Sequence, residues 1–175
     1  LDVGCGYGIL VNYLSLTDPG CRTVGTDIDV ARIEKARKTI GNRNNIGFDV
    51  SDFLGNDFSR FNVVLAIDVL HYFDFEMQDQ IMTHIGNKLG NDSLFIFRYP
   101  DIKPKWKYYW TYFQESIMVG SSITKTNNSK LHFRSSEVIE TVLIKAGFKV
   151  QIYPNTSALP YSDTLFVCTK VAPGQ

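Results

Sequence analysis

The sequence is poor in cysteine, has no excess of either charge and lacks long apolar runs. Its 175 residues include three cysteines without a CxxC spacing, so we predict no metal site and no disulfide framework. Eighteen basic and eighteen acidic side chains give a formal net charge of zero, which disfavours a surface built to grip nucleic acid. No apolar run approaches the roughly 18 residues that span a bilayer, and we expect no signal peptide. We therefore expect one cytoplasmic domain over residues 1–175.

The sequence does contain a regular alternation of short strands, glycine turns and helices, which predicts a doubly wound α/β domain. In such domains ligands bind outside the carboxyl ends of the strands. In the first helix, Ile9, Leu10, Tyr13 and Leu14 are predicted to share one side. The last two strands have no helix between them, so we expect them to pair antiparallel. Strands are predicted at 1–3, 22–26, 46–50, 62–67, 94–98, 148–153 and 164–169, and helices at 8–16, 30–40, 75–89 and 136–146.

The strongest motif is LDVGCGYG at residues 1–8, where three glycines follow a strand and open a helix. Gly4, Gly6 and Gly8 let the backbone approach a ligand closely and adopt positive φ angles. A nicotinamide-binding loop reads GxGxxG, and the place of its last glycine is held here by Ile9. The spacing therefore disfavours a nicotinamide oxidoreductase. A plain tight turn is the alternative, but it does not explain three glycines directly after an acidic residue.

This run resembles the first motif of class I S-adenosylmethionine (SAM)-dependent methyltransferases, and the resemblance extends along the chain. It implies a Rossmann-like seven-stranded sheet of order 3-2-1-4-5-7-6 with the last strand antiparallel. It also implies that the sequence starts within strand one, and that upstream material completes that strand and part of the active-site cover. SAM is the implied cofactor.

The resemblance further implies which residues hold the cofactor. Asp2 helps to hold its methionine end, the carboxylate of Asp27 accepts both ribose hydroxyls, and Ile28 packs on the adenine. Asp52 receives the adenine amino group, with Asp49 as the weaker candidate for this place. Asp29 is a rival to Asp27, with the alternative that it only caps the next helix. The full cofactor-binding set implied is Asp2, Gly4, Cys5, Gly6, Gly8, Asp27, Ile28, Asp52, Phe53, Ala66, Ile67 and Asp68.

Two histidines are candidates for the catalytic base. His71 follows the fourth strand in DVLHYF, where related enzymes line the methyl-transfer site, and histidine titrates near neutral pH. The alternative is that His71 only packs beside the cofactor. His132 lies just before the last helix, where it also reaches the expected pocket.

Residues 99–133 separate the fifth strand from the last helix and are too many for a plain loop. The family's insertions at this place cover the cofactor and select the acceptor. The segment is read in three ways: a stacking patch for nucleic acid, a lid that binds an aromatic or acyl acceptor or a membrane surface through 103–113, or a helical lid whose aromatics pack on the domain. Zero net charge places nucleic acid last. The aromatics are Trp106, Tyr108, Tyr109, Trp110, Tyr112 and Phe113, interleaved with Lys103, Lys105 and Lys107.

A narrower resemblance rests on DVLHYF, FRYPD and GSSITKTNNSKLHFRSSEVI. These runs are similar to the methyltransferase domains of bacterial transporter/acyltransferase/methyltransferase fusion proteins. The function implied is SAM-dependent methyl transfer to a small-molecule or lipid-like acceptor, with O-methylation as the expected reaction. Two alternatives stay open: a non-catalytic SAM-binding module of a larger protein, and a nucleic-acid methyltransferase. The second lacks the Asn/Asp-Pro-Pro-aromatic motif after strand four.

Overall fold

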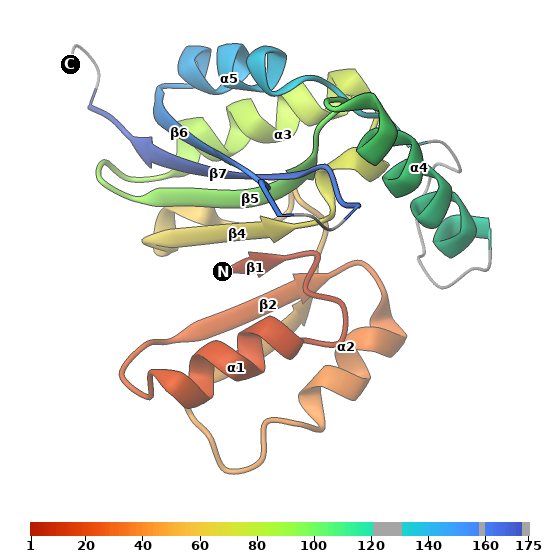
Figure 1. Cartoon of the computed structure of the whole chain (residues 1–175). Coiled ribbons are helices and arrows are strands. Elements are labelled where there is room, and N and C mark those ends of the chain that lie inside the picture. The colour runs from red at the N-terminus through yellow and green to blue at the C-terminus, as the bar shows by residue number, and fades with distance from the viewer. Residues whose placement is uncertain (121–130, 158–159, 173–175) are drawn as a thin grey trace.

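A computed structural model describes residues 1–120, 131–157 and 160–172 (Figure 1). It confirms the alternation of strands and helices. The strands are β1 (Asp2–Val3), β2 (Thr23–Asp27), β3 (Ile46–Val50), β4 (Val63–Ile67), β5 (Leu94–Pro100), β6 (Phe148–Pro154) and β7 (Asp163–Lys170). The helices are α1 (Ile9–Thr17), α2 (Val30–Arg37), α3 (Phe75–Lys88), α4 (Lys105–Gly120) and α5 (Ser136–Lys145), with 3-10 turns η1 (Phe58–Arg60) and η2 (Leu70–Tyr72).

The sheet has the predicted order, β3-β2-β1-β4-β5-β7-β6. Strands β1 to β5 are parallel to their neighbours in this series, and β7 runs antiparallel to both β5 and β6. The chain moves outward from β1 to β3 and then returns to β4 on the other side of β1. The strand order therefore reverses between β1 and β4, and a crevice opens there at the carboxyl ends of the strands.

One face of the sheet is covered by α3 and α5, which lie together above it in Figure 1. The core on this face is fully buried and rich in aromatic rings from β5 and β7. Rings of Phe97 and Phe166 stack with centroids 4.6 Å apart, and Phe95 stacks on Phe97 at 4.8 Å. Ile81 and Ile85 from α3 and Leu143 from α5 close the same cluster.

Helices α1 and α2 lie on the other face, where they cover the β1–β3 half of the sheet. The apolar side predicted for α1 is only partly buried. Val11 and Ser15 face the sheet, whereas Ile9 and Tyr13 are 78% and 62% exposed. The cause is the close approach of α1 to β2: a Cβ on Gly25 would lie 2.9 Å from a methyl group of Val11. Only short side chains fit between these elements.

Element ends near the crevice differ slightly from the sequence prediction. Strand β5 continues to Pro100, so the first two residues of the 99–133 segment belong to the sheet. The next part of that segment is α4, which lies beyond the carboxyl ends of β4 and β5 (Figure 1). Within the described parts of the chain, no helix is both long and apolar enough to cross a membrane.

Candidate cofactor and methyl-transfer site

The glycine loop between β1 and α1 adopts positive φ angles, which residues with a Cβ rarely adopt. Gly4, Gly6 and Gly8 have φ angles of 77°, 56° and 73°, all in the left-handed region. A Cβ on Gly4 would meet Val69 Cγ2 at 2.7 Å, and one on Gly8 would meet the Phe48 ring at 2.3 Å. No atom lies within 4 Å of a Cβ built on Gly6. The loop is therefore packed tightly at both ends and is open in its middle.

Asp27, at the end of β2, ties this loop to the sheet. Its Oδ2 accepts a hydrogen bond from the Gly6 amide at 2.9 Å, and its Oδ1 accepts one from the Asp29 amide at 2.8 Å. Each carboxylate oxygen has a second lone pair, so both can still accept from a ligand. Asp29 accepts hydrogen bonds from the Ala31 and Arg32 amides as the N-cap of α2. The capping interpretation of Asp29 is thus confirmed.

A cavity of about 420 Å³ opens at the crevice. Six of the predicted residues line it, and they come from the loops after β1, β2, β3 and β4. Asp2, Cys5, Gly6, Gly8, Ala66 and Ile67 are not on its wall; they lie in the strands and loop that surround it. The lining members are Gly4, Asp27, Ile28, Asp52, Phe53 and Asp68.

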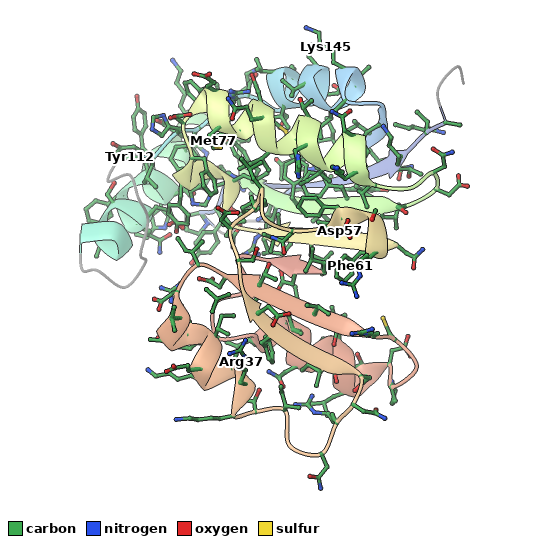
Figure 2. The ribbon with its side chains drawn as sticks, turned by 180° about the vertical axis from the view of Figure 1, so that it is seen from behind. Arg37, Asp57, Phe61, Met77, Tyr112 and Lys145 are labelled. Atoms are coloured by element: carbon green, nitrogen blue, oxygen red, sulfur yellow. The ribbon has the colours of Figure 1, made fainter. Side chains whose placement is uncertain are left out.

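Tyr72, in the loop after β4 that was expected to line the site, is on the wall, while Arg32, Met77 and Ile81 are wall residues that were not predicted. Met77 and Ile81 stand four residues apart on α3, a spacing that is typical of core residues and gives no sign of a ligand. Figure 2 shows Met77 on the part of α3 near α4, the helix that carries Tyr112. On this side the wall is formed by the loop after β4 and by α3, and α4 approaches it through the contact of Glu115 with Tyr72.

The turn after β3 holds Asp52 and Phe53 at the wall. The Asp52 Oδ1 accepts a hydrogen bond from the Gly55 amide at 2.6 Å, while the residue stays exposed. Phe53 is buried and meets the Phe73 ring edge-on at 5.5 Å. One side chain thus presents a carboxylate to the cavity and the next anchors the turn in the core.

Beneath the loop, burial disfavours the charged forms of Asp2 and Cys5. Burial raises the pKa of the Asp2 carboxyl to about 7, with repulsion from Asp27 acting in the same direction. Burial likewise raises the pKa of the Cys5 thiol well above its ordinary value. A cationic ligand near this loop would favour the charged form of Asp2.

The loop after β4 lines the acceptor side. Asp68, which has a φ of 55°, forms an ion pair with Arg98 of β5, with Oδ1 2.7 Å from Nε. Tyr72 lines the cavity and donates its hydroxyl hydrogen to Oε2 of Glu115 on α4 at 2.7 Å. His71 is not on the wall. It is fully buried, with its ring stacked on Phe133 at 5.4 Å.

His132 approaches this loop through its backbone. Its amide donates to the His71 carbonyl at 2.9 Å, and its own carbonyl accepts from the Tyr99 hydroxyl at 2.7 Å. The His132 ring packs edge-on against Phe75 and is not on the cavity wall. The structure therefore brings both predicted histidines to the site and puts neither imidazole in direct contact with the cavity.

Helix α4 is inverted relative to an ordinary amphipathic helix. Of the side chains described in this helix, over residues 105–117, those of Lys107 and Thr111 are buried, and Lys107 Nζ donates to the Ser157 carbonyl at 2.8 Å. The reading in which the aromatics pack on the domain holds for Tyr108, which meets Phe133 edge-on at 5.6 Å. It does not hold for the exposed aromatic face, which comprises Trp106, Tyr109, Trp110 and Phe113.

A sheet of this order with a glycine loop after β1 and a carboxylate at the end of β2 defines a class I SAM-dependent methyltransferase. A family model described as "Methyltransferase domain" matches residues 1–95, more than half of the chain. The chain belongs to this family.

Solved structures share the fold at low sequence identity. Mitomycin 7-O-methyltransferase aligns with a TM-score of 0.76 and 18% identity, over 97% of this chain and 48% of its own. Human N-acetylserotonin methyltransferase in complex with SAM aligns with 0.73 and 16%, over 98% and 47%. Magnesium protoporphyrin IX methyltransferase from Synechocystis PCC 6803 with bound S-adenosylhomocysteine aligns with 0.70 and 16%, over 97% and 72%. These matches show a common architecture.

One curated relative is an uncharacterized protein of Rickettsia prowazekii (strain Madrid E). It is 28% identical over 135 residues, which are 75% of this chain and 53% of the relative. The chain thus spans about half the length of the curated relative that it matches.

Proposed function

We propose that this methyltransferase transfers the methyl group of SAM to a hydroxyl of a small-molecule or lipid-like acceptor. The observation that carries the proposal is the cavity itself. Carboxylates line its cofactor side at the ends of β2 and β3, and a phenol lines its acceptor side at Tyr72. Helix α4 lies beside that phenol through Glu115.

The chemistry of the lining fits the cofactor. Asp27 accepts the ribose hydroxyls with the lone pairs left free by the Gly6 and Asp29 amides. Ile28, which is half-exposed at the wall, packs on the adenine, and Asp52 receives its amino group. Because Gly4 has no side chain, the glycine loop packs closely against Val69, and the backbone of the loop can lie under the methionine end of the cofactor. SAM supplies a methyl group that its sulfonium already activates.

The work left to the protein is alignment, exclusion of water and removal of one proton. The side of the cavity formed by the loop after β4 and by α3 aligns the acceptor, with Tyr72, Phe73 and Met77 on the wall. His71 is the base within this proposal, and it acts from behind the Tyr72 side chain. His132 serves the same loop by fixing the His71 carbonyl through its amide.

The exposed aromatic face of α4 favours an acceptor with an apolar part. Trp and Tyr rings are typical of surfaces that meet a membrane interface, where one edge is apolar and the other wet. Lys105 is exposed at the start of the same helix. We therefore include contact of residues 103–113 with a membrane surface, from the cytoplasmic side, in this proposal.

Radiolabel transfer distinguishes this function from its two rivals. The protein is incubated with methyl-tritiated SAM and, separately, a lipid extract, an aqueous metabolite extract and total RNA and DNA from a bacterial cell. We expect label in the lipid or metabolite fraction and none in nucleic acid. Label in nucleic acid alone would overturn the acceptor class, and label in no fraction would favour a non-catalytic SAM-binding module.

The cofactor assignment is tested by calorimetry of SAM binding to Asp27→Ala. Loss of charged hydrogen bonds to two ribose hydroxyls predicts binding weaker by about 100-fold or more. The matched control is Asp49→Ala on the neighbouring strand β3, because Asp49 pairs with Arg37 and is not on the wall. Equal affinities of the Asp27→Ala variant and the wild type would exclude the ribose role.

A further inference from the structure

Three side chains lie in a row behind the acceptor side of the cavity. Tyr72 is on the wall, and its hydroxyl donates to Glu115 Oε2 at 2.7 Å. The same Oε2 lies 3.7 Å from Nε2 of His71. Since Tyr72 and Glu115 are 43 residues apart in the chain, only the docking of α4 brings them together. One carboxylate thereby links a wall residue to a buried imidazole.

The imidazole of His71 is placed as a proton acceptor. The side chain is 0% exposed, and neither ring nitrogen has a hydrogen-bond partner among the residues that the structure describes. Its ring lies against Tyr72 at 4.3 Å and Phe133 at 5.4 Å. A buried polar group without a partner costs free energy, so its retention calls for an explanation. If His71 took up a proton, its contact with the Glu115 carboxylate, at 3.7 Å from Nε2 to Oε2, would become an ion pair.

Glu115 is charged in this arrangement. Burial raises the pKa of its carboxyl, but the contacts from His71 and Tyr72 and the charge of Arg98 outweigh burial and bring the pKa below its ordinary value. The other charged groups facing this cluster are Asp68, after β4, and Asp163, on β7. Asp68 is paired with Arg98. Glu115 is therefore the carboxylate that stands between phenol and imidazole.

We propose that Tyr72, Glu115 and His71 form a relay that removes the proton of the acceptor hydroxyl. The proposal rests on the hydroxyl acceptor proposed above. Tyr72 is the catalytic residue, because it lines the cavity, and Glu115 and His71 are positioning residues that act through it. Tyr72 lies in the run DVLHYF, whereas no sequence motif marks Glu115.

The step balances in atoms and charge. The acceptor oxygen bonds to the methyl carbon while the methyl–sulfur bond breaks and the sulfur keeps the electron pair. The acceptor proton moves to the Tyr72 oxygen, the Tyr72 proton moves to Glu115, and Glu115 gives a proton to Nε2 of His71. The sulfonium loses its positive charge, and the imidazolium gains one beside the Glu115 carboxylate.

The first test needs no acceptor. Carboxyl-labelled glutamate followed by NMR during a pH titration reports the Glu115 pKa in the wild type and in Tyr72→Phe. We expect the pKa of Glu115 to rise in the variant, because the hydrogen bond that favours its charged form is lost. Tyr13→Phe, which removes an exposed phenol oxygen on α1, should leave it unchanged. An unchanged Glu115 pKa in Tyr72→Phe would contradict the relay.

The second test uses methyl-tritiated SAM with whichever lipid or metabolite fraction the wild type labels. Tyr72→Phe and Glu115→Gln should each lower kcat by about 100-fold, with KM for SAM within about twofold. The wild-type rate should fall in acid as Glu115 takes a proton, and Glu115→Gln should lack this acid limb. Glu34→Gln, an exposed change on α2, is the control for loss of one carboxylate.

The outcomes separate the two proposals. If the wild type labels no hydroxyl acceptor, the proposed function fails and the relay fails with it. If the wild type transfers label and both variants keep its kcat and acid limb, the relay is wrong and the proposed function stands. A loss of rate in Glu115→Gln with the acid limb retained would show a structural role only and would also overturn the relay.

Discussion

The two halves of the sheet hold their functional groups in different ways. In the cofactor half (β1–β3 with α1 and α2), Asp27 is fixed by two backbone amides, and the glycine loop is fixed by its own φ angles. In the acceptor half (β4–β7 with α3–α5), side chains hold each other: Tyr72 bonds Glu115, and Asp68 pairs with Arg98. Backbone contacts survive most substitutions, whereas paired side chains must change together.

This difference suits the two tasks. The cofactor is the same molecule in every reaction of this class, so a site made by backbone and one carboxylate can stay fixed. Acceptors differ from enzyme to enzyme, and side-chain contacts such as that of Tyr72 with Glu115 can be altered without disturbing the sheet. The comparison makes separable predictions: changes in the cofactor half should act through backbone strain, and changes in the acceptor half through lost partners.

The largest expected effect in the cofactor half is on stability, in Gly8→Ala. A left-handed φ costs about 1–2 kcal/mol for a residue with a Cβ, and the 2.3 Å approach to Phe48 adds overpacking of about 1–3 kcal/mol. Gly6→Ala shares the left-handed φ but meets open space, so it should lose only the first amount. Denaturant unfolding measures both. Equal losses in the two variants would show that crowding at Phe48 does not hold this loop.

A smaller effect is expected in the acceptor half from Tyr99→Phe. The buried Tyr99 hydroxyl donates to the His132 carbonyl at 2.7 Å and accepts from the Arg134 amide at 3.2 Å. The His132 carbonyl still accepts from Gln78 Nε2 at 3.0 Å, but the buried Arg134 amide loses its acceptor, which should cost about 1–3 kcal/mol of unfolding free energy. Tyr153→Phe, at an exposed site on β6, should stay within about 0.5 kcal/mol.

The same variant sharpens the comparison of the two halves. Because Tyr99 is not on the cavity wall, SAM affinity measured by calorimetry should change by less than about twofold in Tyr99→Phe. A large fall in SAM affinity with little loss of stability would mean that the two halves are coupled and that their separation is wrong.

The sequence predicted the cofactor half well for a physical reason. Its glycines and carboxylates directly follow strands, and parallel strands bring their carboxyl ends to one edge of the sheet. That these residues meet at one edge of the sheet could therefore be predicted, while the sheet order and the cofactor-binding set, of which six members are on the wall, were implied by the resemblance to the methyltransferase family. The exposure of Ile9 and Tyr13 on α1 could not be predicted, because the absence of a side chain at Gly25 sets how close that helix lies.

The acceptor half was harder to predict from the sequence, because the residues in contact there are far apart in the chain. Glu115 lies in an aromatic helix whose pattern gives no register against the loop after β4, so its contact with Tyr72 has no local signal. His71 was singled out by its position, but its place behind Tyr72 depends on Phe133 and Glu115, which approach from other elements. The roles of both histidines stay predictions.

The smallest expected effect is the pH dependence of the contact between α4 and the loop after β4. The pKa of Glu115 is lowered on folding, so its ionised form stabilises the native state above the ordinary value of 4.5. This contribution is lost as pH falls from 4.5 through the lower native pKa.

The wild type should thus exceed Glu115→Gln in unfolding free energy at neutral pH, by less than about 1 kcal/mol for a partly exposed group. This gap between the two proteins should close in acid. Urea unfolding of both proteins at pH 7 and at decreasing pH below 4.5 measures the gap. A gap that widens in acid would mean that Glu115 is protonated in the native state, and the acceptor half would then lack the charged carboxylate that holds α4 to Tyr72.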